Sequence, residues 1–345
     1  MTSVFVRLFD RLDCSKSQIY SPFSLEAALV VPYVGSDLET KDVLAAEFNK
    51  VIPKGSSPID FYEKLNSYLT DTSVVSMANA IWVNNKSSFK LNERFQKTVE
   101  RVSSIQIIAF DEKFQDTVDG FISGKTKGMI PNGPKIDCSN PHLTTVIVNT
   151  LLFQGKWKVA FPFSWEGDFT LSNGEVIKHP LMSNKMECKY YKDKNMQVIE
   201  LEYLNGFSML VFLARDSLEL CDVSEAKITG VREEMKIRTV EVILPKFTAQ
   251  STISLLKPLI ELTSDKIRGN YNLIGSEPLS ISAIVQQCKI EVDESGTKAA
   301  AAMSVFCETN CIDRRIFFYA DRPFSYTIID TTYQKQLFKG SYLGK

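Results

Sequence analysis

Apolar residues recur with a helical period in the first third of the chain, whereas the later part contains strand-like apolar runs. Two stretches, Leu25–Asn49 and Phe61–Tyr68, have the spacing of helices that bury one face. The strand-like runs are Thr144–Phe153, Gln197–Tyr203, Phe207–Ala214 and Thr239–Phe247. Within the third run, Ser208–Leu213 is almost continuously apolar, which is typical of a strand covered on both faces. Helices followed by strands predict an α+β architecture.

Polar segments that contain proline or glycine separate these elements. They lie near Pro53–Pro58, Pro131–Pro141, Asn173–Gly174 and Gly269–Ser276, and the sequence has no linker, repeat or low-complexity block. A chain of 345 residues is longer than most domains with one core, but this pattern is compatible with one large mixed domain. We therefore expect a single domain over residues 1–345.

The segment Glu294–Ala302 has the most informative pattern in the chain, with four consecutive alanines at its end. Alanine favours a helix, but the alternation at Ile290–Asp293 just before it is typical of a strand. If Thr297 points inward, every second residue up to Thr309 is small or apolar and also points inward. The following residues, Glu308–Arg315, have the composition of an exposed loop. A segment that can be a loop in one state and a central strand in another is a bistable element.

Composition and charge narrow the possible functions. The formal net charge of −1 argues against a nucleic-acid-binding surface, and no run of about 20 apolar residues predicts a membrane span. Charged residues interrupt the N-terminal apolar residues at once, so we expect no signal peptide. The seven cysteines form no CxxC pair and no zinc set. A reducing cytoplasm is the simplest setting for such a protein.

Catalytic motifs are missing from the sequence. The two histidines, His142 and His179, each lie beside a proline in a break, and a serine or cysteine nucleophile needs a base. No nucleophile elbow, zinc-protease, phosphate-loop or dinucleotide motif occurs. We therefore expect no enzyme activity, no catalytic residues, no cofactor and no metal. An unrelated hydrolase remains an alternative that the missing base disfavours.

Six segments along the chain together resemble the serpin family of protease inhibitors. Each is weak alone, but they occur in the order and at spacings compatible with that family. They are Ile19–Leu25, Ser76–Trp82, Val146–Trp157, Val242–Phe247, Glu294–Ala302 and Asp321–Phe324. The resemblance covers nearly the whole chain. It implies a serpin fold, with about nine helices around three β-sheets and an exposed reactive centre loop at about residues 294–316.

The resemblance implies that the protein is a suicide substrate of proteases. A host serine or cysteine protease would attack the loop and become covalently bound as its acyl-enzyme, while the loop inserts into the central sheet. The loop's hinge would consist of Glu294, Gly296, Thr297, Ala299, Ala300, Ala301 and Ala302. Within Thr297–Ala302 only Lys298 is charged, and we expect it to point outward. This favours inhibition over the alternative, a non-inhibitory serpin that acts as a decoy, carrier or interaction protein. We expect a monomer with no nucleic-acid or membrane partner.

Counting places the bond that the protease cleaves. In inhibitory serpins the residue before it lies 14 positions beyond the hinge glycine, and that count from Gly296 reaches Asn310, so the bond is Asn310–Cys311. The loop also resembles that of poxvirus intracellular serpins, one of which has Asp-Cys at the cleaved bond. The spacing in those proteins would instead make Thr309 the residue before the bond. Asparagine suits an asparaginyl endopeptidase better than a protease whose pocket binds a carboxylate. Arg314 and Arg315 would suit a trypsin-like protease. The resemblance also implies a viral inhibitor of host proteases in apoptosis or inflammation.

Further positions match named parts of the serpin fold. Ser21, Ser24 and Asn149 match the polar "shutter" beneath the central sheet, and Gln286 stands where many serpins have a histidine. Glutamine can donate and accept hydrogen bonds, so the network could be retained. Ser21 followed by proline is also typical of a helix N-cap. Trp157 matches the "breach" tryptophan where insertion begins, and an ordinary core aromatic is the alternative interpretation.

Overall fold

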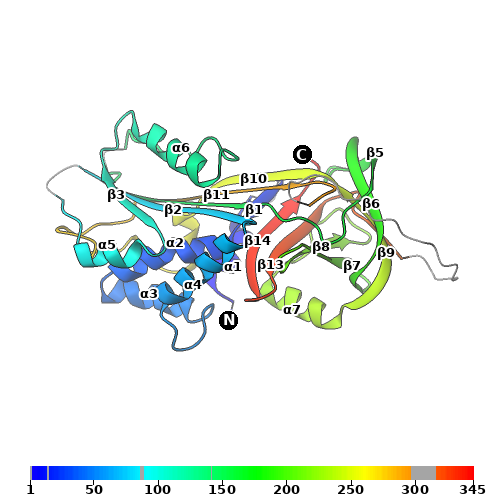
Figure 1. Ribbon diagram of the computed structural model, residues 1–345, viewed down its shortest axis with the longest axis horizontal. Helices are drawn as coiled ribbons and strands as arrows, with labels where there is room; N and C mark the ends of the chain where they lie inside the picture. The colour runs from blue at the N-terminus through cyan, green and yellow to red at the C-terminus, as the bar shows by residue number, and fades with distance from the viewer. Residues whose placement is uncertain (1, 14, 86–88, 141, 297–315) are drawn as a thin grey trace. The chain divides into compact units, whose positions relative to one another are not determined.

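The computed structural model describes residues 2–13, 15–85, 89–140, 142–296 and 316–345 (Figure 1). These residues form eight α-helices, two short 3-10 helices and fourteen strands. The helices are concentrated before residue 126, and most of the strands follow residue 144. The α+β class predicted from the sequence is therefore confirmed.

Figure 1 labels most of these helices and strands. The helices are α1 (Val4–Arg7), α2 (Pro22–Gly35), α3 (Leu38–Phe48), α4 (Pro58–Asp71), α5 (Glu93–Val99), α6 (Phe114–Lys125), α7 (Glu225–Glu234) and α8 (Leu256–Leu262), with 3-10 turns at Leu8–Arg11 and Asp265–Arg268. The strands are β1 (Gln18–Tyr20), β2 (Val75–Asn84), β3 (Ser104–Ile108), β4 (Thr145–Phe153), β5 (Phe163–Thr170), β6 (Val176–Lys192), β7 (Met196–Glu202), β8 (Phe207–Ala214), β9 (Lys236–Pro245), β10 (Phe247–Ser254), β11 (Ala283–Val292), β12 (Ile316–Tyr319), β13 (Phe324–Asp330) and β14 (Lys335–Tyr342).

The first helical stretch was predicted as one element over Leu25–Asn49, and the structure corrects this to two helices. The chain leaves the helical conformation at Ser36, and Asp37 caps α3 by accepting a hydrogen bond from the Thr40 N–H at 3.0 Å. Apolar periodicity runs through this break, but a capping aspartate starts a new helix. The predicted strand Phe207–Ala214 is confirmed, because β8 has these bounds and is buried at every residue, as its continuous apolar run indicated. The predicted strand Thr239–Phe247 is wrong at its end, because β9 stops at Pro245 and Phe247 begins β10 of the other sheet.

The fourteen strands of the described residues form two hydrogen-bonded sheets. The five-stranded sheet has the order β10-β11-β4-β2-β3, so β11 lies directly beside β4. The nine-stranded sheet has the order β1-β14-β13-β8-β7-β6-β9-β12 and branches at β6, to which β5 also pairs. The 17-residue strand β6 is thus shared between two arms, with β7 on one arm and with β5, β9 and β12 on the other. The five-stranded sheet and these two arms correspond to the three sheets that were expected.

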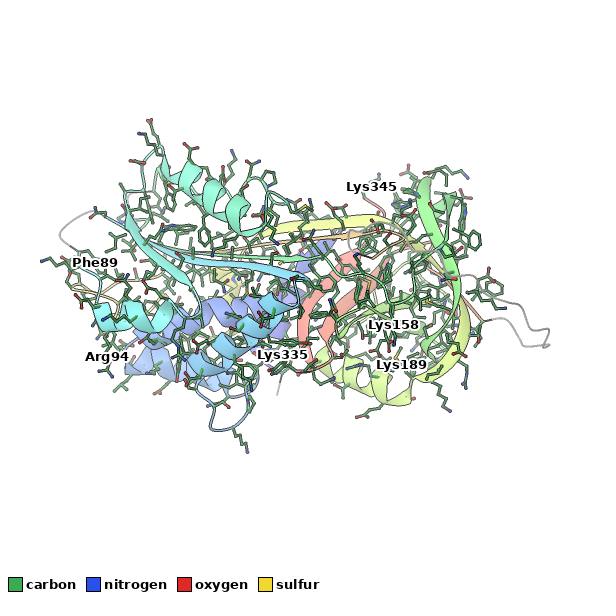
Figure 2. The ribbon with its side chains drawn as sticks, viewed as in Figure 1. Phe89, Arg94, Lys158, Lys189, Lys335 and Lys345 are labelled. Carbon is green, nitrogen blue, oxygen red and sulfur yellow. The ribbon has the colours of Figure 1, made fainter. Side chains whose placement is uncertain are left out.

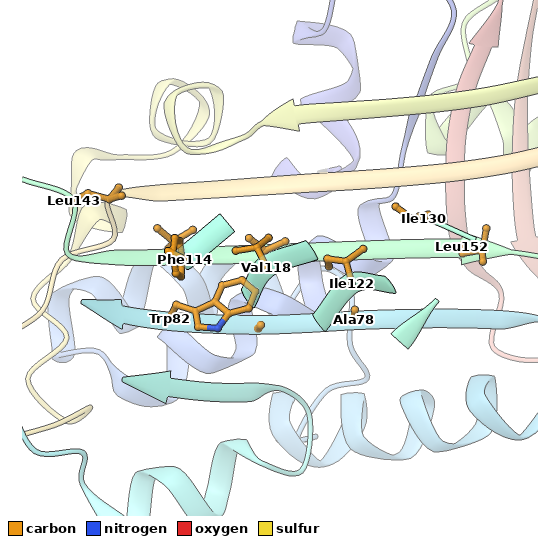
Figure 3. Close-up of a cluster of buried hydrophobic side chains, with 11 residues drawn as sticks. Ala78, Trp82, Phe114, Val118, Ile122, Ile130, Leu143 and Leu152 are labelled. Atoms are coloured by element: carbon orange, nitrogen blue, oxygen red, sulfur yellow. The ribbon is translucent and has the colours of Figure 1, made fainter. Parts of the chain in front are cut away.

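The chain divides into two compact units. Unit 1 contains residues 1–12, 20–152 and 251–289, and unit 2 contains residues 13–19, 153–250 and 290–345. In unit 1, helix α6 packs on the five-stranded sheet, and its Phe114, Val118 and Ile122 face Trp82 and Ala78 of β2 (Figure 3). The proposed single domain over residues 1–345 stays a prediction.

Candidate functional site

The chain leaves β11 through a tight turn at residues 293–296, in unit 2. The Asp293 N–H donates to the Gly296 carbonyl oxygen at 2.8 Å, and the Gly296 N–H donates back to the Asp293 carbonyl oxygen at 3.2 Å. The Asp293 carboxylate also accepts the N–H groups of Ser295 and Gly296, at 2.8 and 3.2 Å. Aspartate side chains commonly close turns in this way. The start of the expected hinge is therefore a closed turn and not a continuation of the strand.

Trp157 binds this turn from the segment that follows β4. Its backbone N–H donates to the Ser295 carbonyl oxygen at 3.0 Å, and its indole N–H donates to the Asp293 carbonyl oxygen at 3.0 Å. The indole ring stacks on Tyr203, with the two ring centroids 4.1 Å apart and an interplanar angle of 13°. The neighbouring Lys158, labelled in Figure 2, donates its backbone N–H to the Glu202 carbonyl oxygen at 2.8 Å. Trp157 is therefore a packed core aromatic that also holds the turn.

Glu294 supplies two further contacts in unit 2. Its carbonyl oxygen accepts the Phe161 N–H at 2.8 Å, and its carboxylate pairs with the Lys246 ammonium at 2.5 Å. Burial raises the pKa of the Glu294 carboxyl, but hydrogen bonds from Lys246, the backbone and Ser164 outweigh burial, so this pKa lies below its ordinary value. The carboxylate is thus charged at neutral pH and remains paired.

At Gly296, both the surrounding atoms and the backbone conformation exclude a side chain. Its φ is +135°, a conformation that is nearly confined to glycine. A Cβ atom there would lie 2.3 Å from the Gly155 carbonyl oxygen and 2.7 Å from the Trp157 nitrogen. Both of these atoms belong to the backbone and cannot rotate away. The chain therefore needs glycine at this position in the observed conformation.

A second polar cluster lies in the interior of unit 1, where α2 meets the five-stranded sheet. The Gln286 side chain accepts the Ser21 N–H at 2.9 Å and donates to the Ser21 carbonyl oxygen at 2.9 Å. It also donates to the Ser24 hydroxyl at 3.1 Å and to the Asn149 side-chain oxygen at 2.9 Å. All four residues are completely buried. Hydrogen bonds in such a low-dielectric site are strong, and a group that loses its partner there is costly.

Asn149 extends this network to two more elements. Its side-chain NH₂ donates to the Ser24 carbonyl oxygen at 2.9 Å and to the Asn79 side-chain oxygen on β2, and its side-chain oxygen accepts the Ser24 hydroxyl at 2.5 Å. Ser21 also caps α2, because its hydroxyl accepts the Ser24 N–H at 3.0 Å and Pro22 follows in the first turn. The network therefore links α2 with β2, β4 and β11 through side chains.

The structure brings half of the predicted site residues, seven of fourteen, into these two clusters. Ser21, Ser24, Asn149 and Gln286 form one cluster, and Trp157, Glu294 and Gly296 form the other. The remaining predicted residues lie outside the described residues: Thr297, Ala299, Ala300, Ala301, Ala302, Asn310 and Cys311.

Sequence reasoning missed three residues that complete these clusters. Asp293 closes the turn, Lys246 pairs with Glu294, and Asn79 binds Asn149. An Asp followed two and three residues later by Ser and Gly is a local turn signal that could have identified Asp293. Lys246 and Asn79 contact residues 48 and 70 positions away, and one sequence contains no signal for such pairs.

The described part of the chain was also compared with the requirements of metal sites and membrane spans. It contains no group of three or more His, Cys, Asp or Glu residues that could hold a metal ion. Its helices are all too short or too polar to cross a membrane. His179, which was expected in a break, lies instead within β6, and its ring is hydrogen-bonded to the Tyr342 hydroxyl at 2.6 Å.

Similar proteins were found by sequence. A family model described as "Serpin (serine protease inhibitor)" matches residues 2–344. An uncharacterized serpin-like protein of Methanosarcina acetivorans is 30% identical over 337 residues, which cover 90% of this chain and 77% of that protein. Serine protease inhibitor 42Dd of Drosophila melanogaster is 27% identical, over 94% of this chain and 91% of that protein.

Solved structures agree with the sequence matches. Tengpin, a thermophilic serpin in its native state, superposes with a TM-score of 0.85 at 24% identity, over 99% of this chain and 92% of that one, which shows the shared fold. Serpin48, a highly specific serpin of the insect Tenebrio molitor, has a TM-score of 0.81 at 25% identity, over 99% and 94% of the two chains. Together with the family match over almost the entire length, these likenesses show that the chain belongs to the serpin family.

Proposed function

We propose that this protein inhibits a protease by acting as its suicide substrate. The observation that carries the proposal is the bound turn at residues 293–296, which precedes the segment 297–315 and follows a strand that lies directly beside β4. The segment joins β11 to β12, so a cut within it frees a new end that starts at the turn. That end can enter the five-stranded sheet between β11 and β4.

The chemical step balances without a cofactor. The protease's serine or cysteine nucleophile attacks the Asn310 carbonyl carbon and forms an ester or thioester with it. The Asn310–Cys311 peptide bond breaks, and Cys311 leaves as a free amine after taking a proton. The hinge residues Thr297 and Ala299 to Ala302 then pair as a new strand. The attached protease is carried away from the loop's original position before water can release it.

The buried network of unit 1 supports this mechanism. Gln286 on β11 binds Asn149 on β4, and these two strands are neighbours in the sheet. A strand that enters between them increases their separation by about 4.8 Å. We infer that Ser21, Ser24, Asn149 and Gln286 form a shutter that keeps the sheet closed until cleavage.

The target follows from the residue before the bond. Asn310 is neutral and fits an asparaginyl endopeptidase, whereas Arg314 and Arg315 fit a trypsin-like protease if cleavage occurs further along. We propose that the natural target is a host protease of apoptosis or inflammation in the cytoplasm, because the Asn-Cys pair resembles the loop of poxvirus intracellular serpins. The protein acts as a monomer, and one domain spans residues 1–345.

One assay tests the proposal. The protein is incubated with an asparaginyl endopeptidase, an aspartate-specific protease and trypsin in turn, and each mixture is run on an SDS gel. An SDS-resistant band of summed mass is expected, together with a released peptide that begins at Cys311. A released peptide that begins at Arg315 or Ile316 would show that the protease cleaves after Arg314 or Arg315. Cleavage by all three proteases without a covalent band supports a decoy substrate and contradicts inhibition.

Thr297→Arg gives a sharper test. The variant is expected to fold and to be cleaved, but to form no covalent complex, because insertion would bury an unpaired guanidinium. Lys298→Arg is the matched control, since residue 298 is expected to point outward. A stable complex of Thr297→Arg with the protease would contradict insertion.

A further inference from the structure

A cavity of about 380 Å³ lies at the surface of unit 2. Three parts of the chain meet there: the residues just before β1, the turn between β5 and β6, and the residues that follow β14. None of the residues that line it belongs to the turn at residues 293–296 or to the buried network of unit 1. Its volume is in the range of pockets that bind small molecules.

Hydrogen bonds and close packing hold the walls of this cavity together. The Ser17 hydroxyl donates to the Lys345 main-chain oxygen at 2.6 Å and accepts the Leu343 N–H at 3.0 Å. Gly344 packs against the turn between β5 and β6, because a Cβ atom on it would lie only 2.5 Å from Cδ2 of Leu171. Its φ of +95° is also typical of glycine. The cavity is therefore already formed in the structure.

The turn between β5 and β6 is closed by its own hydrogen bonds. The Leu171 N–H donates to the Glu175 carbonyl oxygen at 2.8 Å, and the Gly174 N–H donates to the Leu171 carbonyl oxygen at 2.9 Å. The Asn173 side-chain oxygen accepts the Glu175 N–H at 3.0 Å. The NH₂ group of Asn173 has no partner among the described residues, so the turn offers a donor to the cavity.

The cavity offers more donors than acceptors. The side-chain oxygens of Ser17 and Asn173 already accept backbone N–H groups. Lys16 and Lys345 each carry an ammonium group with three donors and no acceptor. Within the described ranges of the chain, neither ammonium lies within 4.0 Å of a carboxylate. Lys345 is labelled in Figure 2. A ligand of this cavity must therefore supply acceptors and negative charge.

Asp13 is an acid close to Lys16, and it is engaged with the chain. Hydrogen bonds from Ser15 hold the pKa of the Asp13 carboxyl below its ordinary value, and the charge of Lys16 lowers this pKa further. The carboxylate accepts the Ser15 N–H at 3.0 Å. Asp13 therefore offsets at most one of the two ammonium groups.

We propose that this cavity binds a small organic phosphate or sulfate monoester. The ester's charged oxygens accept hydrogen bonds from Lys16, Lys345 and the Asn173 NH₂ group, and its organic part lies on Leu171 and Leu343. Phosphate and sulfate esters share this negative charge and these acceptor oxygens, so the experiment has to separate them. The proposal does not depend on protease inhibition, because the cavity shares no residue with the parts of the chain assigned to that function.

Calorimetric titration of the intact protein at low ionic strength tests the proposal. The probes are phenyl phosphate, phenyl sulfate and inorganic phosphate. Lys16→Met and Lys345→Met remove one ammonium group each, and both lysines are exposed, so the variants are expected to fold. Lys194→Met is the matched control, because Lys194 is an exposed lysine of the same unit that does not line the cavity.

We expect at least one phenyl ester to bind, and the one that binds more tightly identifies the ligand as a phosphate or a sulfate. Each cavity variant should bind it at least about tenfold more weakly, whereas Lys194→Met should match the unaltered protein. Added salt should weaken binding, because it screens charges near the surface. Inorganic phosphate lacks the apolar part and should bind about tenfold more weakly than phenyl phosphate.

Three results would overturn the proposal. The first is that neither phenyl ester binds at concentrations up to about 10 mM. The second is that an ester binds with equal affinity to the unaltered protein and to both cavity variants, which would place its site elsewhere. The third is that inorganic phosphate binds as tightly as the phenyl esters, which would contradict an organic ligand.

Discussion

Gly296→Ala tests whether the turn at residues 293–296 belongs only to the uncleaved state. In the observed conformation the added methyl group meets the Gly155 carbonyl oxygen at 2.3 Å and the Trp157 nitrogen at 2.7 Å. Relief of such overlap with backbone atoms costs about 1–3 kcal/mol. The positive φ of +135° adds about 1–3 kcal/mol for a residue other than glycine. We therefore expect the intact protein to lose about 3 kcal/mol of stability, within these two ranges.

The cleaved protein should respond differently. Once the loop inserts, residue 296 continues an extended strand, where alanine is unstrained and meets none of these atoms. Urea unfolding of the intact and the loop-cleaved forms measures both effects. For the intact variant, a slope of about 3 kcal/mol/M converts the loss to a midpoint that is lower by about 1 M. The midpoint of the cleaved variant should equal that of the cleaved unaltered protein.

Gly230→Ala is the matched control in the same unit. Gly230 lies in α7 with no atom within 4 Å of its added Cβ, so alanine should stabilise both forms by up to about 1 kcal/mol. An equal loss in the intact and cleaved forms of Gly296→Ala would refute the reasoning, because the turn would then persist after cleavage. No loss in either form would show that the turn is not the state of the intact protein in solution.

Two further changes probe the two clusters, and a third probes a buried hydroxyl group on β4. Glu294→Gln should lower stability at pH 7 by about 1 kcal/mol or less, because the ion pair is partly exposed. Since the pKa of Glu294 lies below its ordinary value of 4.5, this contribution is complete above that pH and is lost as the pH falls through the lowered value, so the difference in unfolding midpoint should disappear on acidification. Asn149→Ala leaves the buried Gln286 and Ser24 side chains short of a partner and should cost about 2–4 kcal/mol in urea unfolding; a cost below 1 kcal/mol would contradict a tight network. Thr150→Val removes a buried hydroxyl that has no partner among the described residues, so the intact form should become more stable by about 1 kcal/mol in the same assay.

The fold was predictable where local pattern and burial agree. The run Phe207–Ala214 is apolar at nearly every position and forms a strand with the same bounds. The predicted Thr144–Phe153 differs from β4 by one residue at its start, and the predicted Gln197–Tyr203 differs from β7 by one residue at each end. By contrast, Leu25–Asn49 is two helices, because the capping bond of Asp37 outweighs the continuing periodicity.

The candidate site was predictable only in part, because its contacts join distant positions. Ser21 and Gln286 are 265 residues apart, and their resemblance to a family placed them together before any geometry was known. Nothing in one sequence pairs Lys246 with Glu294, or Lys289 with the carbonyl oxygen of Met129. Such pairs depend on the register of the whole sheet, which a one-residue shift would change at every position.

Buried polar atoms without partners lower the stability of the five-stranded sheet in its form without an inserted strand. Side-chain atoms of Asn79 on β2, Thr145 and Thr150 on β4, and Gln287 on β11 are buried without a hydrogen-bond partner among the described residues. Each such atom costs about 1–3 kcal/mol. All four residues lie on β4 or on a strand beside it. A sixth strand rich in small residues, with hydroxyl groups at Thr297 and Ser304, would bring backbone and side-chain partners to this region. The free-energy cost of these unpaired atoms thus belongs to the sheet without an inserted strand, and insertion of the loop would relieve it. A loop-insertion inhibitor must meet this energetic condition.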